Sequence, residues 1–321
     1  MKHLLFITHG SDLDYQNDTV FHGLCSLPET EVAILNENNY DYMFKGLCPE
    51  EKLRSLYGKG FTLSNRVPVE KKCVHSRDEA LKNIRDKYYD FVVYGSIFRC
   101  DDLLSDVVRY YPRNKILLID GEDEDFHFRL TRGCRYRFFL ERRALKYAGK
   151  GLYFKREMLP RFRGVFQPVS FAIPEELVVE KVPENKERRL AFIIPGNPDT
   201  YIYKDEDSYY KGYQTAVFGM TCRKAGWDCL RHYEILANGC IPYFPDIDEL
   251  PPDTMPFFPR ALIRYGNMLY ESGAAADECL ELSCRLLEHT RKFLTTRFQA
   301  EYLLSAAGKC AEMPGGVRSL V

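Results

Sequence analysis

In the first half of the chain, segments with helical spacing of apolar residues alternate with short, continuous apolar runs. Ser76 and Glu79 have the spacing of a capping box, and the helical pattern that follows leads into an apolar run at 90–95. A second helical pattern, which the Asp-Asp pair at 101–102 is expected to cap, leads into the run 115–119. Such alternation with short connections is typical of parallel strands joined by crossover helices, so we predict a Rossmann-like sheet here.

The first apolar run, residues 4–7, ends in a loop that carries His9 and Asp12. Loops at the carboxyl ends of parallel strands line the ligand crevice of an open α/β sheet. Because imidazole titrates near neutral pH, His9 is a candidate general base for an acceptor hydroxyl, and Asp12 is a candidate base or a partner that orients the histidine. The alternative is a loop histidine that only packs or caps.

A proline-containing stretch, residues 160–189, ends in a run of charges and is typical of a surface connection between domains. The chain of 321 residues is long enough for two α/β domains of about 150 residues each. We place the boundary near 165–185. The predicted domains are an N-terminal Rossmann-like domain over 1–170 and a C-terminal domain over 171–321.

The second half is predicted to be a smaller α/β domain followed by long helices. Its expected elements are a strand at 190–194, an apolar run at 216–221, a helix at 227–238 ended by Gly239, a strand at 241–244 and a helical tail over 275–308 that breaks once. The first two elements lie too close together for the further strand–helix units of a full Rossmann domain. We therefore expect a trimmed second domain.

The segment 223–242 combines cations with a predicted helix start in a way that suits a nucleotide. The first backbone N–H groups of a helix and its dipole favour an anion such as a diphosphate, and Arg223, Lys224 and Arg231 add positive charge. Glu234 shares a helix face with Arg231, and its carboxylate can accept both hydroxyl protons of a ribose. The alternative is a solvated Arg–Glu pair on the protein surface.

The order of these residues, Gly226-Trp227-Asp228-x-x-Arg231-x-x-Glu234 and then Gly239-Cys240-Ile241-Pro242, resembles the nucleotide-sugar motif of exostosin-like and CgeB-like glycosyltransferases. The resemblance implies a GT-B-like fold, in which two Rossmann-like domains face a cleft, with the acceptor domain over 1–170 and the nucleotide-sugar-binding domain over 171–321. It also implies that Glu234 holds the ribose, that Arg231 lies near the phosphates, and that the turn 239–242 packs beneath the nucleotide. The residues expected in the donor site are Arg223, Lys224, Gly226, Trp227, Asp228, Arg231, Glu234 and Gly239.

Residues 118–123 and 153–157 are similar to further stretches of the same group. Many retaining members of the GT-B class have a second glutamate eight positions before the ribose-binding one, where this chain has Gly226. A retaining mechanism is therefore not indicated. An inverting route would take its base from His9, Asp12 or Asp120.

Acidic residues gather after the run 115–119. Asp120 is a candidate base, and Asp123-Glu124-Asp125 has the Asp-x-Asp form by which GT-A glycosyltransferases hold a divalent metal. A charge run of this kind is also typical of a solvated loop. Lys155 and Arg156 are candidate contacts to phosphate or acceptor, or else the end of a surface helix.

The predicted function is metal-independent transfer of a sugar from a nucleoside diphosphate sugar to a hydroxyl acceptor, which is a glycan, a lipid-linked acceptor or a protein. No cofactor and no metal are expected. Two alternatives stay open, a metal-dependent transferase that uses residues 123–125 and a non-catalytic nucleotide-sugar-binding protein derived from a transferase. Calorimetry with nucleoside diphosphates, with and without a chelator, separates the three.

Composition narrows the partners and the compartment. With 45 basic and 46 acidic residues the net charge is −1, which does not favour nucleic-acid binding. The apolar runs are too short to cross a bilayer, so at most peripheral membrane contact is expected. The opening segment is too short for a signal peptide and the cysteines are scattered, which favours reduced thiols and a cytoplasmic location.

Overall fold

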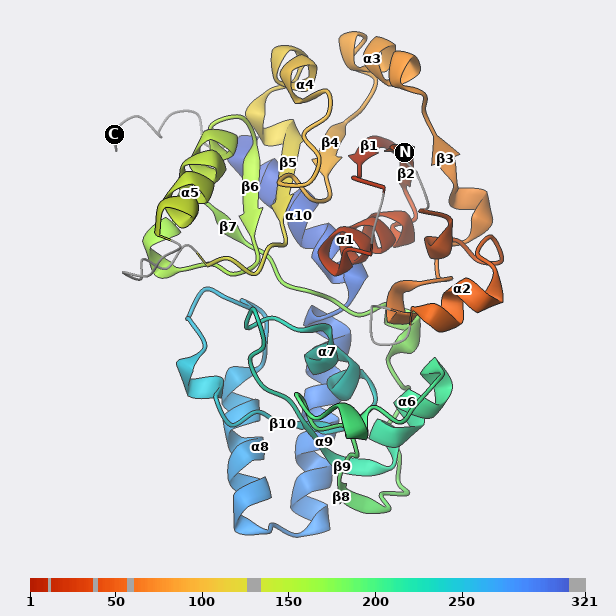
Figure 1. Cartoon of the computed structure of the whole chain (residues 1–321), viewed down its shortest axis with the longest axis vertical. Helices are drawn as coiled ribbons and strands as arrows, with labels where there is room; N and C mark the ends of the chain where they lie inside the picture. Colours follow the sequence, from red (N-terminus) through yellow and green to blue (C-terminus); the bar gives the residue numbers. More distant parts are fainter. Residues whose placement is uncertain (11–12, 37–39, 57–60, 126–133, 312–321) are drawn as a thin grey trace.

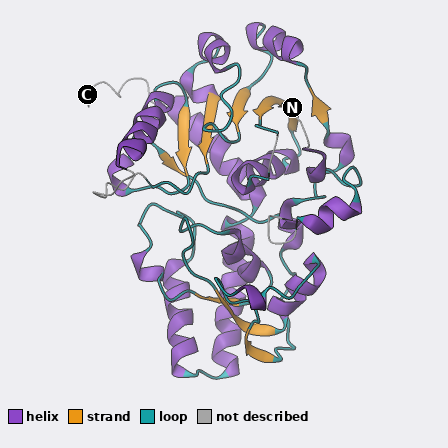
Figure 2. Cartoon of the chain, viewed as in Figure 1, coloured by secondary structure: helices purple, strands orange, loops and turns teal. Residues whose placement is uncertain are grey.

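The computed structural model describes residues 1–10, 13–36, 40–56, 61–125 and 134–311. Two sheets lie one above the other in Figure 1, and helices flank both of them in Figure 2. Every pairing between the named strands of either sheet is parallel. This arrangement confirms the predicted α/β class with two parallel, Rossmann-like sheets.

The first sheet has seven strands among the described residues, in the order β3-β2-β1-β4-β5-β6-β7. The strands are β1 (Lys2–Ile7), β2 (Thr30–Leu35), β3 (Cys73–Val74), β4 (Phe91–Tyr94), β5 (Ile116–Asp120), β6 (Leu152–Lys155) and β7 (Gln167–Pro168). Strand order reverses at β1 and β4, and the carboxyl ends of strands at such a point form the ligand crevice of an open sheet. The predicted strands at 4–7, 90–95 and 115–119 are confirmed.

Helices cover both faces of this sheet. They are α1 (Tyr15–Ser26), α2 (Glu50–Ser55), α3 (Arg77–Arg85), α4 (Leu104–Tyr110) and α5 (Cys134–Ala148). Along β1, Leu4 and Phe6 pack in the core on the α1 side, whereas Leu5 and Ile7 pack in the core that includes residues of α3 and α4. All four are fully buried, which explains why the strand is a continuous apolar run rather than an alternating one.

The caps of two helices were predicted from sequence, with different outcomes. The Ser76 side chain accepts a hydrogen bond from the Glu79 N–H at 3.2 Å at the start of α3, as the capping-box spacing indicates. The prediction that the acidic pair caps α4 is wrong, because the cap residue is Leu103 at φ 57°. The Asp101 carboxylate instead accepts from the Tyr147 hydroxyl, and the Asp102 carboxylate from the Asn36 amide.

The second sheet is small, with three strands among the described residues in the order β10-β9-β8. Its elements are β8 (Arg188–Leu190), α6 (Glu206–Gln214), β9 (Ala216–Met220), α7 (Leu230–Ala237), β10 (Ile241–Tyr243), α8 (Arg260–Ser272) and α9 (Ala276–Phe293). The trimmed second sheet was expected. Helix α7 begins later than predicted because the residues before Leu230 form a loop, and Gly239 ends it at φ 63° as expected.

The last helix, α10 (Thr296–Ala311), returns to the first sheet and packs on α1, crossing from the lower to the upper half of Figure 1. The two helices touch so closely that a Cβ on Gly23 would lie 2.1 Å from the Thr296 carbonyl oxygen. The helical tail breaks once, between α9 and α10, as predicted. The chain therefore passes between the two halves twice, and its division at residue 170 into two domains stays a prediction.

Two global properties complete the description. None of the described helices combines the length and the apolar character needed to cross a membrane. The cysteines whose side chains are described are free thiols.

Candidate functional site

The loop 221–229, between β9 and α7, is held against the first half of the chain by Glu157, which follows β6. The buried Glu157 carboxylate accepts hydrogen bonds from the backbone N–H of Trp227 at 3.1 Å and of Asp228 at 3.0 Å. Gly226 permits this approach, because a Cβ there would lie 2.6 Å from Glu157 Oε1. The Gly-Trp-Asp part of the motif thus forms a contact between the two halves.

Arg156 reinforces the same contact. Its guanidinium donates to the Asp228 carbonyl at 2.8 Å and to the Gly121 carbonyl, and it pairs with Asp123 and Glu157. The side chain is only 3% exposed and lies over the Phe171 ring. Arg156 therefore joins the two halves in this structure and does not present its charge to a ligand.

Lys155 and Asp120 form a fully buried ion pair, with 3.2 Å between Nζ and Oδ2 and both side chains 0% exposed. The Tyr153 hydroxyl also donates to the Asp120 carboxylate, at 2.5 Å. A carboxylate enclosed in this way cannot reach an acceptor hydroxyl. In this conformation, Asp120 and Lys155 stabilise the ends of β5 and β6 rather than line the site.

Trp227 and Asp228 are also interior residues. Trp227 is 3% exposed and packs in the core of the second half. The Asp228 carboxylate accepts from the Phe171 N–H at 2.6 Å and from the Tyr233 hydroxyl at 2.8 Å, and burial raises its pKa to about 7. Both residues shape the loop that precedes α7, and neither faces a nucleotide in this structure.

Arg231, in the first turn of α7, is buried with unused hydrogen-bond donors. Its Nη2 donates to the Tyr201 hydroxyl at 3.1 Å, whereas its Nε and Nη1 have no hydrogen-bond partner among the described residues. The residue is 8% exposed. Lys224 approaches the same Tyr201 ring, with 6.0 Å between Nζ and the ring centroid. A buried guanidinium with unmet donors favours an anion beside it.

Glu234, one turn further along α7, is also buried. Its carboxylate accepts from the Thr62 hydroxyl, which belongs to the first half of the chain, and from the Tyr209 hydroxyl at 2.5 Å. Burial raises the pKa of Glu234, although the two hydroxyls and the charge of Arg231 oppose the shift. Since Arg231 and Glu234 are both interior, the solvated surface pair considered from the sequence is not present.

Each acidic residue of the run 123–125 pairs with an arginine, and Arg223 is one of these arginines. The Arg223 guanidinium lies over the Trp227 ring and 4.0 Å from Asp125. Glu124 pairs with Arg137 at 3.0 Å, and Asp123 pairs with Arg156. Within the described part of the chain, no group of three or more His, Cys, Asp or Glu side chains is arranged to hold a metal ion.

His9 follows β1, as predicted, and its partner is a residue that the sequence reasoning missed. His9 Nε2 lies 3.6 Å from Oδ2 of Asp14, whose carboxylate caps α1 by accepting from the Gln16 N–H at 3.1 Å. Burial works against the charge of Asp14, but His9 and Arg99 outweigh it and hold the pKa of Asp14 below its usual value. Asp12 lies outside the described residues.

The start of α1 lies close to the start of α7. Tyr15 follows the capping Asp14, and burial together with the charge of Glu234 raises the pKa of Tyr15, while Arg231 opposes the rise. Tyr15, which follows the Asp14 partner of His9, thus lies close enough to Arg231 and Glu234 for their charges to act on it. The residues that lie at the site but were not predicted are Asp14, Tyr15, Thr62 and Tyr201.

The fold and the site define an α/β protein with two parallel sheets. Two buried charged residues, Arg231 and Glu234, lie on α7 where the two halves of the chain contact each other. No known protein family and no curated protein matches the chain by sequence. Among solved structures, it is similar to the crystal structure of CalG4, the calicheamicin glycosyltransferase, at 12% identity and a TM-score of 0.40 over 97% of this chain and 99% of that one. A likeness this loose assigns the chain neither a family nor an activity.

Asp18, a buried acid near Asp14, gives the stability of the fold a testable dependence on pH. Burial and the neighbouring Asp14 charge raise the pKa of Asp18 to about 8, while the Tyr42 hydroxyl donates to its carboxylate. An unfolded aspartate titrates near about 3.9, so between about pH 4 and about pH 8 the folded state keeps a proton that the unfolded state releases. The free energy of unfolding should therefore fall as pH rises through this window.

Asp18→Asn should reduce that fall by at least about 1 kcal/mol, because the amide does not ionise. The measurement is urea unfolding at several pH values between 4 and 9, and the exposed Asp199→Asn serves as the control. Parallel pH profiles for wild type and Asp18→Asn would contradict the raised pKa.

Proposed function

We propose that this chain is a glycosyltransferase that takes its sugar from a nucleoside diphosphate donor and passes it to a hydroxyl acceptor without a bound metal. The observation that carries the proposal is the pair of buried groups on α7, the Arg231 guanidinium with unmet donors and the Glu234 carboxylate one turn away. A diphosphate satisfies the first group and a ribose diol satisfies the second.

The leaving diphosphate would be stabilised by Arg231, by the exposed Lys224 and by the N-terminus of α7. Cys229, the residue before α7, makes no side-chain capping hydrogen bond, unlike the Asp14 side chain at the start of α1. Arg223 contributes less, because it already lies beside Asp125.

The base of an inverting reaction would be His9 in this proposal. Asp14 sits 3.6 Å from its Nε2 and can stabilise the imidazolium that forms when His9 takes the acceptor proton. Asp120 is a poorer candidate, since its carboxylate is enclosed with Lys155. The acceptor would therefore enter beside the loop after β1.

A non-catalytic nucleotide-sugar-binding protein is the second candidate, and the enclosure of Asp120 and the small second sheet favour it. The metal-dependent alternative is less favoured, because Asp123, Glu124 and Asp125 each face an arginine. Calorimetry with UDP, GDP, ADP and dTDP tests the shared donor site, and no binding by any of them would reject it. Turnover of a bound donor separates enzyme from binder, and loss of that turnover with EDTA, reversed by manganese, would favour the metal-dependent reading.

The role of Glu234 is tested by comparing a ribonucleotide with its 2′,3′-dideoxy analogue. In the wild type, loss of the two ribose hydroxyls should weaken binding about tenfold, because charge-assisted hydrogen bonds are lost. In Glu234→Gln the two nucleotides should bind within about twofold of each other, since the coupled partner is gone. The exposed Glu288→Gln on α9 is the matched control, and an unchanged preference in Glu234→Gln would remove Glu234 from the site.

A further inference from the structure

The Glu234 carboxylate, which is proposed to bind the ribose, already accepts a hydrogen bond from a hydroxyl in the first half of the chain. Thr62, fully buried, donates to Oε1 of Glu234, and the Tyr209 hydroxyl donates to Oε2 at 2.5 Å. The Tyr210 hydroxyl donates to the Thr62 oxygen at 2.9 Å and holds it in place. Each oxygen of Glu234 therefore carries a hydroxyl, as it would in a complex with a vicinal diol.

The segment 62–66, which carries Thr62, is fixed to the first half of the chain. The N–H groups of Asn65 and Arg66 donate to the carbonyls of Tyr42 and Met43 at 2.6 and 3.0 Å. These backbone bonds make the segment move with the first sheet rather than with α7.

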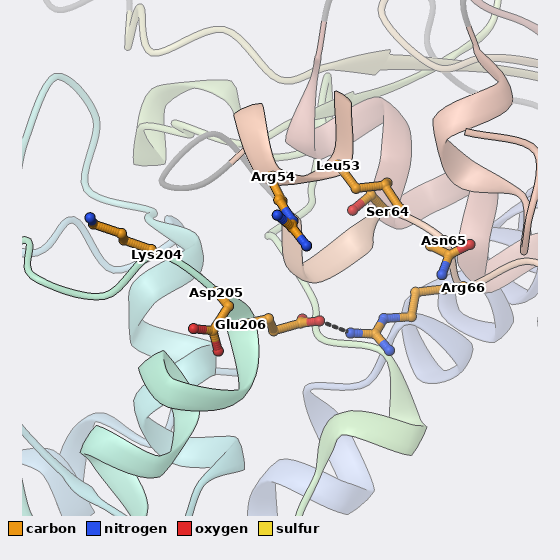
Figure 3. Close-up of a pocket in the computed structure, with 8 residues that line it drawn as sticks. All are labelled: Leu53, Arg54, Ser64, Asn65, Arg66, Lys204, Asp205 and Glu206. Carbon is orange, nitrogen blue, oxygen red and sulfur yellow. Dashed lines mark hydrogen bonds and ion pairs between the residues drawn. The ribbon is translucent and has the colours of Figure 1, made fainter. Parts of the chain in front are cut away.

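A second contact joins the same segment to the second half. The Arg66 guanidinium pairs with Glu206, at the start of α6, as the dashed line in Figure 3 marks. The pair lies in a pocket of about 180 Å³ whose walls come from both halves, with Arg54 and Asn65 on one side and Lys204 on the other. Thr62 and Arg66 thus bridge the two halves at two neighbouring points.

We propose that segment 62–66 is a latch that closes the ribose position of the donor site. This inference rests on the proposed function. In the closed state the Thr62 hydroxyl stands where a ribose hydroxyl would bind Glu234. A nucleotide enters only after the Thr62–Glu234 and Arg66–Glu206 contacts break, and its ribose then replaces the Thr62 hydroxyl. The apparent affinity is accordingly the intrinsic affinity reduced by the fraction of molecules with an open latch.

The test is to weaken the latch at each of its two points and to measure UDP and GDP binding by calorimetry. Thr62→Val keeps the side-chain shape and removes the hydroxyl, and Arg66→Gln removes the ion pair and leaves Glu234 untouched. Each variant should bind the nucleotide more tightly than the wild type, by about three- to tenfold, because one interdomain hydrogen bond or ion pair no longer opposes opening. Lys72→Gln is the control, since it breaks an ion pair with Asp41 that stays within the first half.

The outcomes separate the latch from the proposed function. Tighter binding in Arg66→Gln, with Lys72→Gln unchanged, supports the latch, as does binding by Arg66→Gln when the wild type binds nothing. If the wild type binds a nucleotide and Arg66→Gln binds it no more tightly while remaining folded, the latch is wrong and the donor site stands. If neither the wild type nor any variant binds, the donor site itself is rejected, and the latch with it.

Discussion

Arg231→Met is expected to weaken binding of the nucleoside diphosphate about a hundredfold, because two charge-assisted hydrogen bonds of about 1.5 kcal/mol each are lost. The same change should raise the free energy of unfolding by about 1 kcal/mol, since a buried charge with unmet donors is replaced by an apolar side chain. Calorimetry with UDP and GDP and urea unfolding of the free protein measure the two effects. Opposite signs for affinity and stability are what distinguish a ligand-binding arginine from a structural one.

Arg260→Met provides the matched comparison. The Arg260 guanidinium donates to the carbonyls of Leu250, Pro251 and Thr254, so its donors are already used within the fold. Its replacement should lower stability and leave nucleotide affinity unchanged. If Arg231→Met behaves in the same way, Arg231 is a structural residue and the phosphate site is elsewhere.

Glu157→Ala is expected to lower the free energy of unfolding by about 3–5 kcal/mol, because it breaks a buried ion pair with Arg156. It also leaves the backbone N–H groups of Trp227 and Asp228 without their acceptor. The loop before α7 should lose its fixed position as a result. Nucleotide affinity should therefore fall even at temperatures at which the variant is still folded. Urea unfolding followed by circular dichroism measures the first effect, and calorimetry measures the second.

Two further variants bracket the effect of Glu157→Ala. Glu157→Gln retains one carbonyl oxygen as an acceptor and should cost less than the alanine variant. Glu288→Ala, on the exposed face of α9, should change stability by no more than about 0.5 kcal/mol. A loss of under 1 kcal/mol for Glu157→Ala would contradict the view that this carboxylate holds the two halves together.

The sequence predicted those parts of the fold whose signal is local. The central strands were recognised because they are buried on both faces and so appear as continuous apolar runs. Helix α1 was missed because its buried face includes Gln16, Asn17 and Asp18, which interrupt the apolar period. Strand β6 ends in Lys155, whose charge pairs with Asp120 of the neighbouring strand β5, so its burial could not be inferred from residues close to it in the sequence.

The site shows the same division between local and distant partners. The motif drew attention to Arg231 and Glu234, which the structure places together on α7, and their role in binding a nucleotide stays a prediction. It could not show that Gly226 faces Glu157, or that Thr62 donates to Glu234, because those partners come from the other half of the chain. The residues of the motif therefore fall into two groups. Arg231 has hydrogen-bond donors without partners among the described residues, whereas Gly226 and Asp228 form contacts between the two halves of the chain.

The return of α10 to the first sheet constrains how the two halves move. Where the chain crosses, the Ile173 N–H donates to the Leu294 carbonyl at 3.0 Å, and the Thr296 N–H donates to the Ile173 carbonyl at 2.9 Å. These two segments, bonded side by side, keep the two halves of the chain next to each other at this crossing. In the proposed latch, Thr62 and Glu234 therefore stay at a high effective concentration while the segment 62–66 is open, so that reclosure is an intramolecular step.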